Sequence, residues 1–267
     1  MQRYEDAAKA FEDLLKTRDR LRDPGGCPWD MEQTLETAKT YLLEEAFEAV
    51  EAADRKDLRS LAEELGDLIF QALFMARIAM DLGGPHDKEI LDEVGLKLIS
   101  RHPHVFGTEK AETVQEVLLT WGRVKSREEK RKDKSALDGV PTALPALVAA
   151  HRLQEKAGQV GFDWQLEQDI RGPWSKIKEE VAELDEALEN RDSEQVKDEI
   201  GDLLFSIVNL ARKLKIDAEG ALRSANSRFK SRFEYIEQTL SHEGRTVRDT
   251  PLSRLDDLWN EAKSKGN

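Results

Sequence analysis

The stretch that decides the fold is IKEEVAELDEALENRDSEQVKDEIGDLLFSIVNLAR, residues 177–212. Its first part holds Glu179, Glu180 and Glu183; after a polar break come Glu199 and Asp202, and then an apolar run. Burying a carboxylate without a partner is costly. Acids that lead directly into an apolar helix are therefore unusual, and they point to a site as well as to a structural element.

The same stretch occurs earlier in the chain, at residues 42–77, as LLEEAFEAVEAADRKDLRSLAEELGDLIFQALFMAR. Each acid of the first copy recurs 135 positions later in the second. The acids of the first copy are Glu44, Glu45, Glu48, Glu64 and Asp67. Each half also ends on a Trp-x-x-x-Lys-Ser pattern, at Trp121 and Trp259. This duplication predicts two tandem helical-bundle domains, over residues 1–125 and 147–267, joined by a charged linker over 126–146.

Hydrophobic residues recur with a helical period along most of the chain. This period predicts helices over 2–22, 34–54, about 58–82, 87–100, 113–132, 147–158, about 173–189, 193–215, 217–240 and a short stretch around Leu255 and Trp259. The segments 23–30 and 101–107 are rich in glycine, proline or both and are expected to interrupt the helices. Because no segment alternates with period two, the sequence predicts an all-α fold.

Composition excludes several classes of function. The net charge of −13 argues against binding along a nucleic-acid backbone, which needs clustered Lys and Arg. Cys27 is the single cysteine, so no intrachain disulfide is expected. The N-terminus has no signal-type apolar core, and no run of about 18 apolar residues is present. We expect a cytoplasmic protein without a membrane partner.

The spacing of the acids predicts a metal site. At 100° per residue, Glu45 and Glu48 lie at one edge of an apolar arc, and Glu64 and Asp67 share one face of the next helix. A short turn makes the two helices antiparallel neighbours, so four carboxylates meet at the edge of a core. The second copy repeats this with Glu180, Glu183, Glu199 and Asp202. Such acids repel one another unless a cation joins them.

All-oxygen ligation favours Mg²⁺, with Mn²⁺ as a substitute, over zinc. A di-iron bundle would need Glu-x-x-His on facing helices, and no histidine has a glutamate three positions before it. The alternative is that the acids form an ordinary solvated helix face. Two copies with identical spacing argue against that alternative.

The motif Glu-Glu-x-x-Glu, then fifteen residues, then Glu-x-x-Asp resembles the signature of the MazG nucleoside triphosphate pyrophosphohydrolases. The resemblance extends over nearly the whole chain, through GGCPWD at 25–30, RHPHVF at 101–106 and LDGVP at 137–141. It implies hydrolysis of nucleoside triphosphates to the monophosphate and pyrophosphate, with Mg²⁺ held by the acids. It also implies helical bundles that complete their sites as homodimers, and a broad role in nucleotide-pool housekeeping.

The resemblance implies roles for individual residues. One of Glu179, Glu180 and Glu183 would orient or deprotonate the attacking water. The helix after the acids resembles the family pattern Asn-x-Lys-Phe-x-x-Arg-Phe, although position 228 is Arg where Lys is usual. The residues expected to contact substrate are Asn209, Asn226, Arg228, Arg232, Trp259 and Lys263. Surface ion pairing is the alternative for the two arginines, and packing is the alternative for Trp259.

The second half is expected to be the main catalytic unit. Asn209 lies seven residues after Asp202 and so on the same face, whereas the matching position in the first half is Phe74. Both acid sets are intact, so both are expected to bind metal. A different class of function stays open from the residues alone: a non-catalytic helical scaffold or regulatory protein whose acids bind structural cations.

Overall fold

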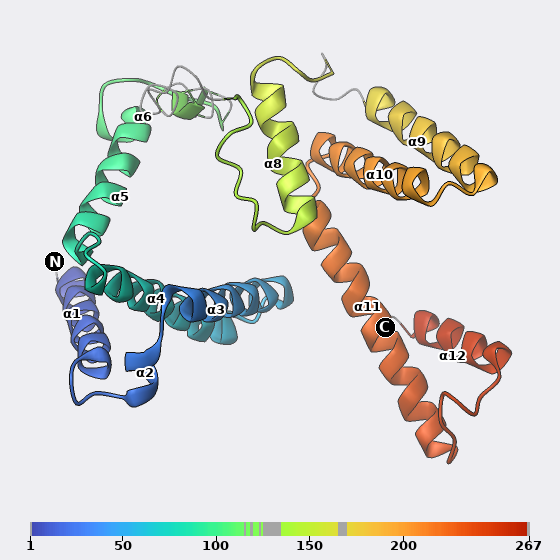
Figure 1. The fold of residues 1–267 in the computed structure, drawn as a ribbon, viewed down its shortest axis with the longest axis horizontal. Helices are drawn as coiled ribbons and strands as arrows, with labels where there is room; N and C mark the ends of the chain where they lie inside the picture. The colour runs from blue at the N-terminus through green and yellow to red at the C-terminus, as the bar shows by residue number, and fades with distance from the viewer. Residues whose placement is uncertain are drawn as a thin grey trace. The chain divides into compact units, whose positions relative to one another are not determined.

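Regular structure in the described residues is entirely helical, and the all-α prediction is confirmed (Figure 1). The computed structural model describes residues 2–114, 116–117, 120–122, 124, 135–164 and 170–265. It divides the chain into two compact units, Met1–Arg131 and Lys132–Asn267. The predicted domain limits 1–125 and 147–267 stay predictions. The first part of the predicted linker, much of the predicted helix over 113–132, and Lys125 and Ser126 lie outside the described residues.

The helices of the first unit follow the predicted order. They are α1 (Gln2–Arg22), α2 (Pro28–Glu32), α3 (Leu35–Arg55), α4 (Leu58–Asp81), α5 (Asp87–Arg101) and α6 (Pro103–Phe106). The short helices α2 and α6 lie in the two segments predicted as interruptions, and each has a proline at its first helical turn. Proline lacks the backbone N–H that a first turn leaves unpaired, so it starts a short helix as readily as it ends a long one.

The second unit contains α8 (Ala146–Gln159), α9 (Arg171–Asn190), α10 (Ser193–Lys213), α11 (Ala218–His242) and α12 (Leu252–Ser264). Helices α9 and α10 form an antiparallel hairpin, as α3 and α4 do in the first unit (Figure 1). Helix α12 folds back on α11. The two hairpins carry the repeated acids.

The two hairpins turn in the same way. Lys56 and Arg191, which are equivalent in the repeat, both adopt left-handed backbone conformations, with φ of 56° and 53°. Each is followed by an aspartate, Asp57 or Asp192, whose carboxylate accepts hydrogen bonds from two backbone N–H groups of the next helix. These aspartates are N-caps, which satisfy donors that a helix start leaves unpaired. The repeated turn fixes how the two acid-bearing helices face each other.

Each unit contains its own cluster of buried hydrophobic side chains. In the first unit, Ala38, Phe74 and Ile78 are buried between α3 and α4. In the second, Ile236, Leu240 and Leu258 are buried between α11 and α12. At about 25 cal/mol per Å² of buried apolar area, each of the larger side chains in these clusters stabilises its unit by about 2–3 kcal/mol.

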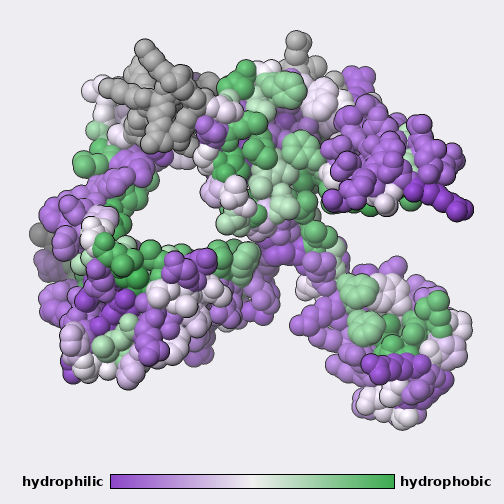
Figure 2. All heavy atoms as spheres, viewed as in Figure 1, coloured by the Kyte–Doolittle hydropathy of each residue, from purple (hydrophilic) through white to green (hydrophobic). Residues whose placement is uncertain are grey.

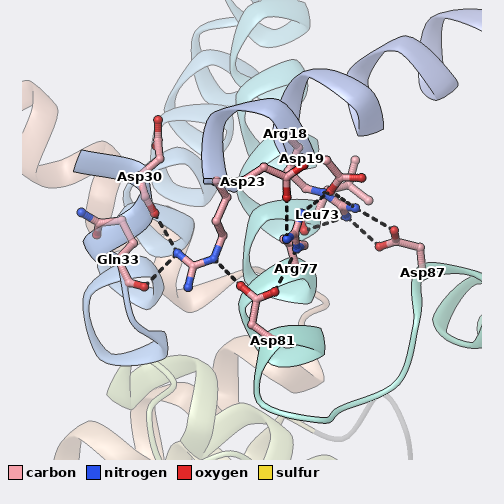
Figure 3. Close-up of polar contacts among 10 residues, drawn as sticks. Arg18, Asp19, Asp23, Asp30, Gln33, Leu73, Arg77, Asp81 and Asp87 are labelled. Carbon is pink, nitrogen blue, oxygen red and sulfur yellow. Dashed lines mark hydrogen bonds and ion pairs between the residues drawn. The ribbon is translucent and has the colours of Figure 1, made fainter. Parts of the chain in front are cut away.

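A network of arginines and aspartates joins α1, α4 and α5 in the first unit (Figure 3). At its centre the guanidinium of Arg18, only 1% exposed, donates to both carboxylate oxygens of Asp87 at 2.7 and 2.8 Å. Arg18 also donates to the Leu73 carbonyl of α4 at 3.2 Å. Hydrogen bonds from Arg18 lower the pKa of Asp87. A buried charge with this many partners is stable only while they stay in place.

Arg77 and Arg22 extend the same network. Arg77 donates to Asp19, Asp23 and Asp81 at 2.9–3.0 Å. Arg22 donates to Asp81 at 2.7 Å and to backbone carbonyls near α2. Burial raises the pKa of Asp81, but the hydrogen bonds from the two arginines outweigh it and leave that pKa below its ordinary value. The network therefore ties α2 as well as α5 to the hairpin helix α4.

The second unit has a smaller group of ion pairs, formed by Arg212, Lys213 and Asp163. Arg212, which matches Arg77 in the repeat, donates to both oxygens of Asp163 at 3.0 and 2.9 Å, and the ammonium of Lys213 lies 2.8 Å from the same carboxylate. Burial raises the pKa of Asp163, but the hydrogen bonds from Arg212 and Lys213 outweigh this effect and lower the pKa to about 2.

The ion pairs of Asp163 predict that the second unit loses stability in acid. The pKa of Asp163 is lower in the folded state than the ~3.9 of an unfolded aspartate, so its stabilisation of about 2 kcal/mol is present above pH ~4 and is lost as pH falls toward 2. We expect Asp163→Asn to lose stability at pH 7 and to show a flatter acid dependence, measured by urea unfolding with hydrogen exchange in α10. Asp185→Asn, an exposed aspartate on α9, is the control; equal behaviour of the two variants would contradict the prediction.

Many apolar side chains of the hairpins face outward. Phe47 on α3 is 50% exposed and Ile69 on α4 is 48% exposed, while Leu204 and Phe205 on α10 are 48% and 43% exposed. Figure 2 shows apolar residues gathered along α4 and α5 on the face viewed. Exposed apolar patches of this kind mark interaction surfaces more often than free surface. In the described part of the chain, no helix is long and apolar enough to cross a membrane.

Candidate metal and nucleotide site

The second hairpin gathers three carboxylates from two helices. Glu180 of α9 and Glu199 and Asp202 of α10 each offer an oxygen, and these atoms lie within 4.8 Å of one another. We call these residues the second triad. Glu180 is 2% exposed, while Asp202 is exposed, so the group lies at the edge of the hairpin. The predicted meeting of acids from both helices is what the structure shows here.

A lysine that the motif did not indicate lies against this triad. The ammonium of Lys176, one turn before Glu180 on α9, lies 2.6 Å from Glu180 Oε1 and 2.8 Å from Glu179 Oε1. The hydrogen bonds that Lys176 donates to Glu179 and Glu180 raise the pKa of its ammonium and keep it protonated. The nearly buried Glu180 carboxylate thus has a positive partner from its own helix.

Two of the predicted acids lie beside the triad rather than in it. Glu183 is exposed and falls outside the group of three. Slight desolvation and the nearby charge of Glu180 raise the pKa of Glu183, although Lys176 opposes this. Glu179 is engaged by Lys176. All three glutamates that were predicted to handle water therefore lie at one edge of α9, within reach of the same charges.

The first hairpin forms a related group, the first triad, with two acids from its first helix, Glu45 and Glu48 of α3, and one from its second, Glu64 of α4. Desolvation and the charge of Asp67 raise the pKa of Glu45, and desolvation and the charge of Glu48 raise that of Glu64. Asp67 lies outside the triad, yet its charge acts on two members. Carboxylates that raise one another's pKa are stabilised when a cation neutralises them.

The oxygen donors of both triads fit a hard divalent cation. Every member is a carboxylate, which Mg²⁺ and Mn²⁺ prefer, and no thiolate or imidazole belongs to either group. Acids from both helices of each hairpin converge on one point, which an ordinary solvated face would not require.

A group of aromatic and cationic residues lies on α11 and α12. The Arg232 guanidinium lies 5.5 Å from the centre of the Trp259 ring, and the Phe229 ring lies 5.2 Å from the same indole. Asn226, Arg228 and Lys263 are exposed on the same two helices. Trp259 also packs against the buried cluster of α11 and α12, so the packing alternative describes part of its role.

Asn209 has a partner within its own helix. Its side-chain oxygen accepts hydrogen bonds from Arg212 at 3.2 and 2.8 Å, and Arg212 is held in turn by Asp163. The contact with Arg212 explains why a polar residue stands in this apolar segment, and no ligand is needed for the explanation. Because the oxygen is occupied, the amide NH₂ of Asn209 is the end left to donate to a substrate.

Comparison with known proteins identifies the family. The model of the MazG nucleotide pyrophosphohydrolase domain matches this chain twice, at residues 33–106 and 173–236. The chain belongs to the MazG family. Both triads fall within the matched ranges, as do Asn209, Asn226, Arg228 and Arg232, whereas Trp259 and Lys263 lie beyond the second match. The predictions of a nucleotide pyrophosphohydrolase and of a tandem form are thereby confirmed.

Full-length relatives in the MazG family support the same assignment. The chain is 41% identical over 258 residues to the nucleoside triphosphate pyrophosphohydrolase/pyrophosphatase MazG of Thermotoga maritima, covering 97% of each chain. It is 40% identical to the nucleoside triphosphate pyrophosphohydrolase of Escherichia coli K12, covering 94% of this chain and 95% of that one. A mazG-related protein from Thermotoga maritima with a known crystal structure is 33% identical in sequence to this chain. The alignment covers 43% of this chain and 98% of that protein, with a TM-score of 0.39.

The MazG motif marks acids and gives no signal for Lys176. The repeat does offer one: at the equivalent position of the first half stands Tyr41, whose ring meets that of Trp29 edge-on at 5.5 Å. A lysine replacing an aromatic residue, at a position where the two copies otherwise align, is a difference that a closer comparison of the halves would have found.

Proposed function

We propose that this MazG-family protein hydrolyses nucleoside triphosphates to nucleoside monophosphate and pyrophosphate in an Mg²⁺-dependent reaction. The observation that carries the proposal is the convergence of three carboxylates from two helices in each hairpin, with one acid of each helix at an equivalent position in both. Its relatives from Thermotoga maritima and Escherichia coli carry the corresponding activity in their names. A broad housekeeping role, in the cytoplasm, is part of the proposal.

The residues that would hold the metal in the second half are Glu180, Glu199 and Asp202, with Glu183 beside them. When bound, a divalent cation neutralises triphosphate charge and stabilises the pyrophosphate leaving group. The attacking water is oriented by one of Glu179, Glu180 and Glu183, which share one edge of α9. A carboxylate at that edge accepts the proton that water loses as it attacks the α-phosphorus.

Cationic and aromatic residues supply the remaining contacts. Arg228 and Arg232 are one turn apart on α11, and paired guanidinium groups bind phosphate oxygens with directed hydrogen bonds. Trp259 offers an indole face to a base, and Asn226, Lys263 and the amide NH₂ of Asn209 add donors. These contacts favour the second half as the main catalytic unit, because the first half has Phe74 where the second has Asn209.

The exposed apolar residues of the hairpins support a homodimer. Phe47 and Ile69 lie on α3 and α4, the helices that carry the first triad. Covering them with a second copy would remove apolar area from water near the acids.

We expect sedimentation equilibrium to give the mass of two chains, and the double substitution of Phe47→Glu with Ile69→Glu to shift that mass toward one chain. Charges at the interface would oppose the burial that holds the copies together. Leu252→Glu on α12, 73% exposed, is the control because it lies on neither hairpin nor α5. A monomeric wild type at all concentrations would contradict the dimer.

The proposed reaction is tested by pyrophosphate release from a panel of nucleoside triphosphates. With Mg²⁺ present, we expect equal amounts of monophosphate and pyrophosphate; excess EDTA should remove the activity and added Mg²⁺ should restore it. Release of inorganic phosphate with a diphosphate product would point to a different bond being cut. If no nucleotide yields pyrophosphate or inorganic phosphate, the proposed reaction is wrong and the alternative, a helical scaffold with cation sites, takes its place.

A further inference from the structure

The two triads share two equivalent positions, Glu45 with Glu180 and Glu64 with Glu199. They differ in their third member, Glu48 or Asp202, and in one charged neighbour. In the second, the Lys176 ammonium lies 2.6 Å from Glu180 Oε1 and 2.8 Å from Glu179 Oε1. The Glu180 side chain is only 3% exposed, so water does little to solvate its charge. Lys176 is therefore its main counter-ion, held one helical turn away on the same helix.

The first triad has no such counter-ion from the equivalent position. Tyr41 stands there, and its ring packs edge-on against Trp29. Within the described part of the chain, no ion pair to a lysine or arginine is found for Glu45, Glu48 or Glu64. Desolvation and then the charges of other acids, Asp67 first, raise the pKa of Glu45.

We propose that Lys176 is an internal counter-ion that competes with the divalent cation for Glu180, so that the second triad binds metal more weakly than the first. The inference rests on the proposed metal binding. A cation that joins Glu180, Glu199 and Asp202 either displaces the ammonium from Glu180 or binds the same carboxylate beside it. Both outcomes oppose binding, because the first separates a charge pair at a nearly buried carboxylate and the second places two positive charges next to each other. A cation entering the first triad only relieves repulsion among acids.

The consequence is an order of loading within one chain. At low metal concentration the first triad fills, and the second triad, on the half predicted to be catalytic, fills only at higher concentration. The difference in metal affinity between the triads is set by the strength of the Lys176–Glu180 ion pair. Because Lys176 is 40% exposed, we discount the pair for solvent screening and expect about a tenfold difference in affinity.

The experiment measures Mn²⁺ binding to the full chain without nucleotide, by the electron paramagnetic resonance signal of free Mn²⁺. Each triad is measured separately, in a variant in which the other no longer binds metal. Glu45→Gln with Glu64→Gln removes binding at the first triad (the first background), and Glu199→Gln with Asp202→Asn removes it at the second (the second background). In the first background, where the second triad is measured, Lys176→Met should tighten Mn²⁺ binding about tenfold, and Lys176→Arg should leave it within about twofold of the parent.

Lys178→Met is the matched control in the same background. It removes the same charge two residues along α9, from a lysine whose ammonium lies over the Trp174 ring, 5.7 Å from its centre. In the second background, Tyr41→Lys should weaken binding at the first triad about tenfold, which tests the inference independently of how Lys176→Met folds.

Three results would overturn the inference: unchanged affinity in Lys176→Met, equal tightening in Lys178→Met, or unchanged affinity in Tyr41→Lys. The first and third would leave the proposed function standing if the wild type still releases pyrophosphate with Mg²⁺. If the wild type binds Mn²⁺ at neither triad and EDTA does not affect hydrolysis, the metal dependence itself is wrong and the inference falls with it.

Discussion

Replacing Glu180 by glutamine is expected to lower pyrophosphate release by at least about 10³-fold, which corresponds to about 4 kcal/mol of lost transition-state stabilisation. The substitution keeps the size of the side chain and removes its charge. Glu180 is the most buried member of the second triad and the one that meets both Glu199 and Lys176. Its loss therefore removes a proposed metal ligand and leaves the Lys176 ammonium with Glu179 as its remaining acidic partner. Initial rates under saturating Mg²⁺ measure the effect.

Two variants control this prediction. Glu186→Gln changes an exposed acid further round α9 and should leave the rate within about twofold. Glu45→Gln changes the equivalent acid of the first triad and should leave most of the activity, because the second half is proposed to be catalytic. Loss of activity in Glu45→Gln alone would assign catalysis to the first half, and full activity in Glu180→Gln would exclude the second triad from the reaction.

Replacing Arg18 by methionine is expected to destabilise the first unit by about 3–5 kcal/mol, the usual cost of removing one partner from a buried ion pair. Methionine fills much of the same space but leaves Asp87, itself 18% exposed, without its two hydrogen bonds. The Leu73 carbonyl also loses a donor. Urea titration read by hydrogen exchange in α1 and α4 isolates the first unit from the second, since two units need not unfold in one step.

A double-mutant cycle separates the pair from simple loss of packing. Arg18→Met in an Asp87→Asn background should cost less than in the wild type, because no uncompensated carboxylate then remains. Arg55→Met, which breaks an exposed pair with Glu51 at 3.2 Å, should cost less than about 1 kcal/mol. Equal costs for the buried and exposed arginines would mean that the network of Figure 3 contributes little.

The long helices and the acid hairpins could be predicted because both are local. The end of α1 at Arg22, the N-cap Asp57 before α4 and the start of α5 at Asp87 follow from hydrophobic period, capping and turn residues within a few positions. The meeting of Glu180 with Glu199 follows from one short turn. The short helices α2 and α6 were missed because glycine and proline signal a break without saying whether one helical turn fits inside it.

The ion pairs across the fold could not be predicted, because they join residues far apart in sequence. Arg18 and Asp87 are partners only after α1, α4 and α5 have packed. Arg77 and Arg212 are equivalent in the repeat, yet one binds three aspartates and the other mainly Asp163. Lys176 was missed for a different reason: it is one turn from Glu180, but lysines near acids are common on helices and only its absence from the first half marks it.

The shared turn at Lys56 and Arg191 also bears on how the chain reaches its folded state. All acids of a triad come from one hairpin, so the contacts that assemble each triad span about 20 residues, far fewer than the 69 between Arg18 and Asp87. Contacts of low sequence separation form early and fast. The acids of a hairpin therefore come together before long-range contacts such as those of Arg18 are made, and duplication of a hairpin carries its acids with it as one unit.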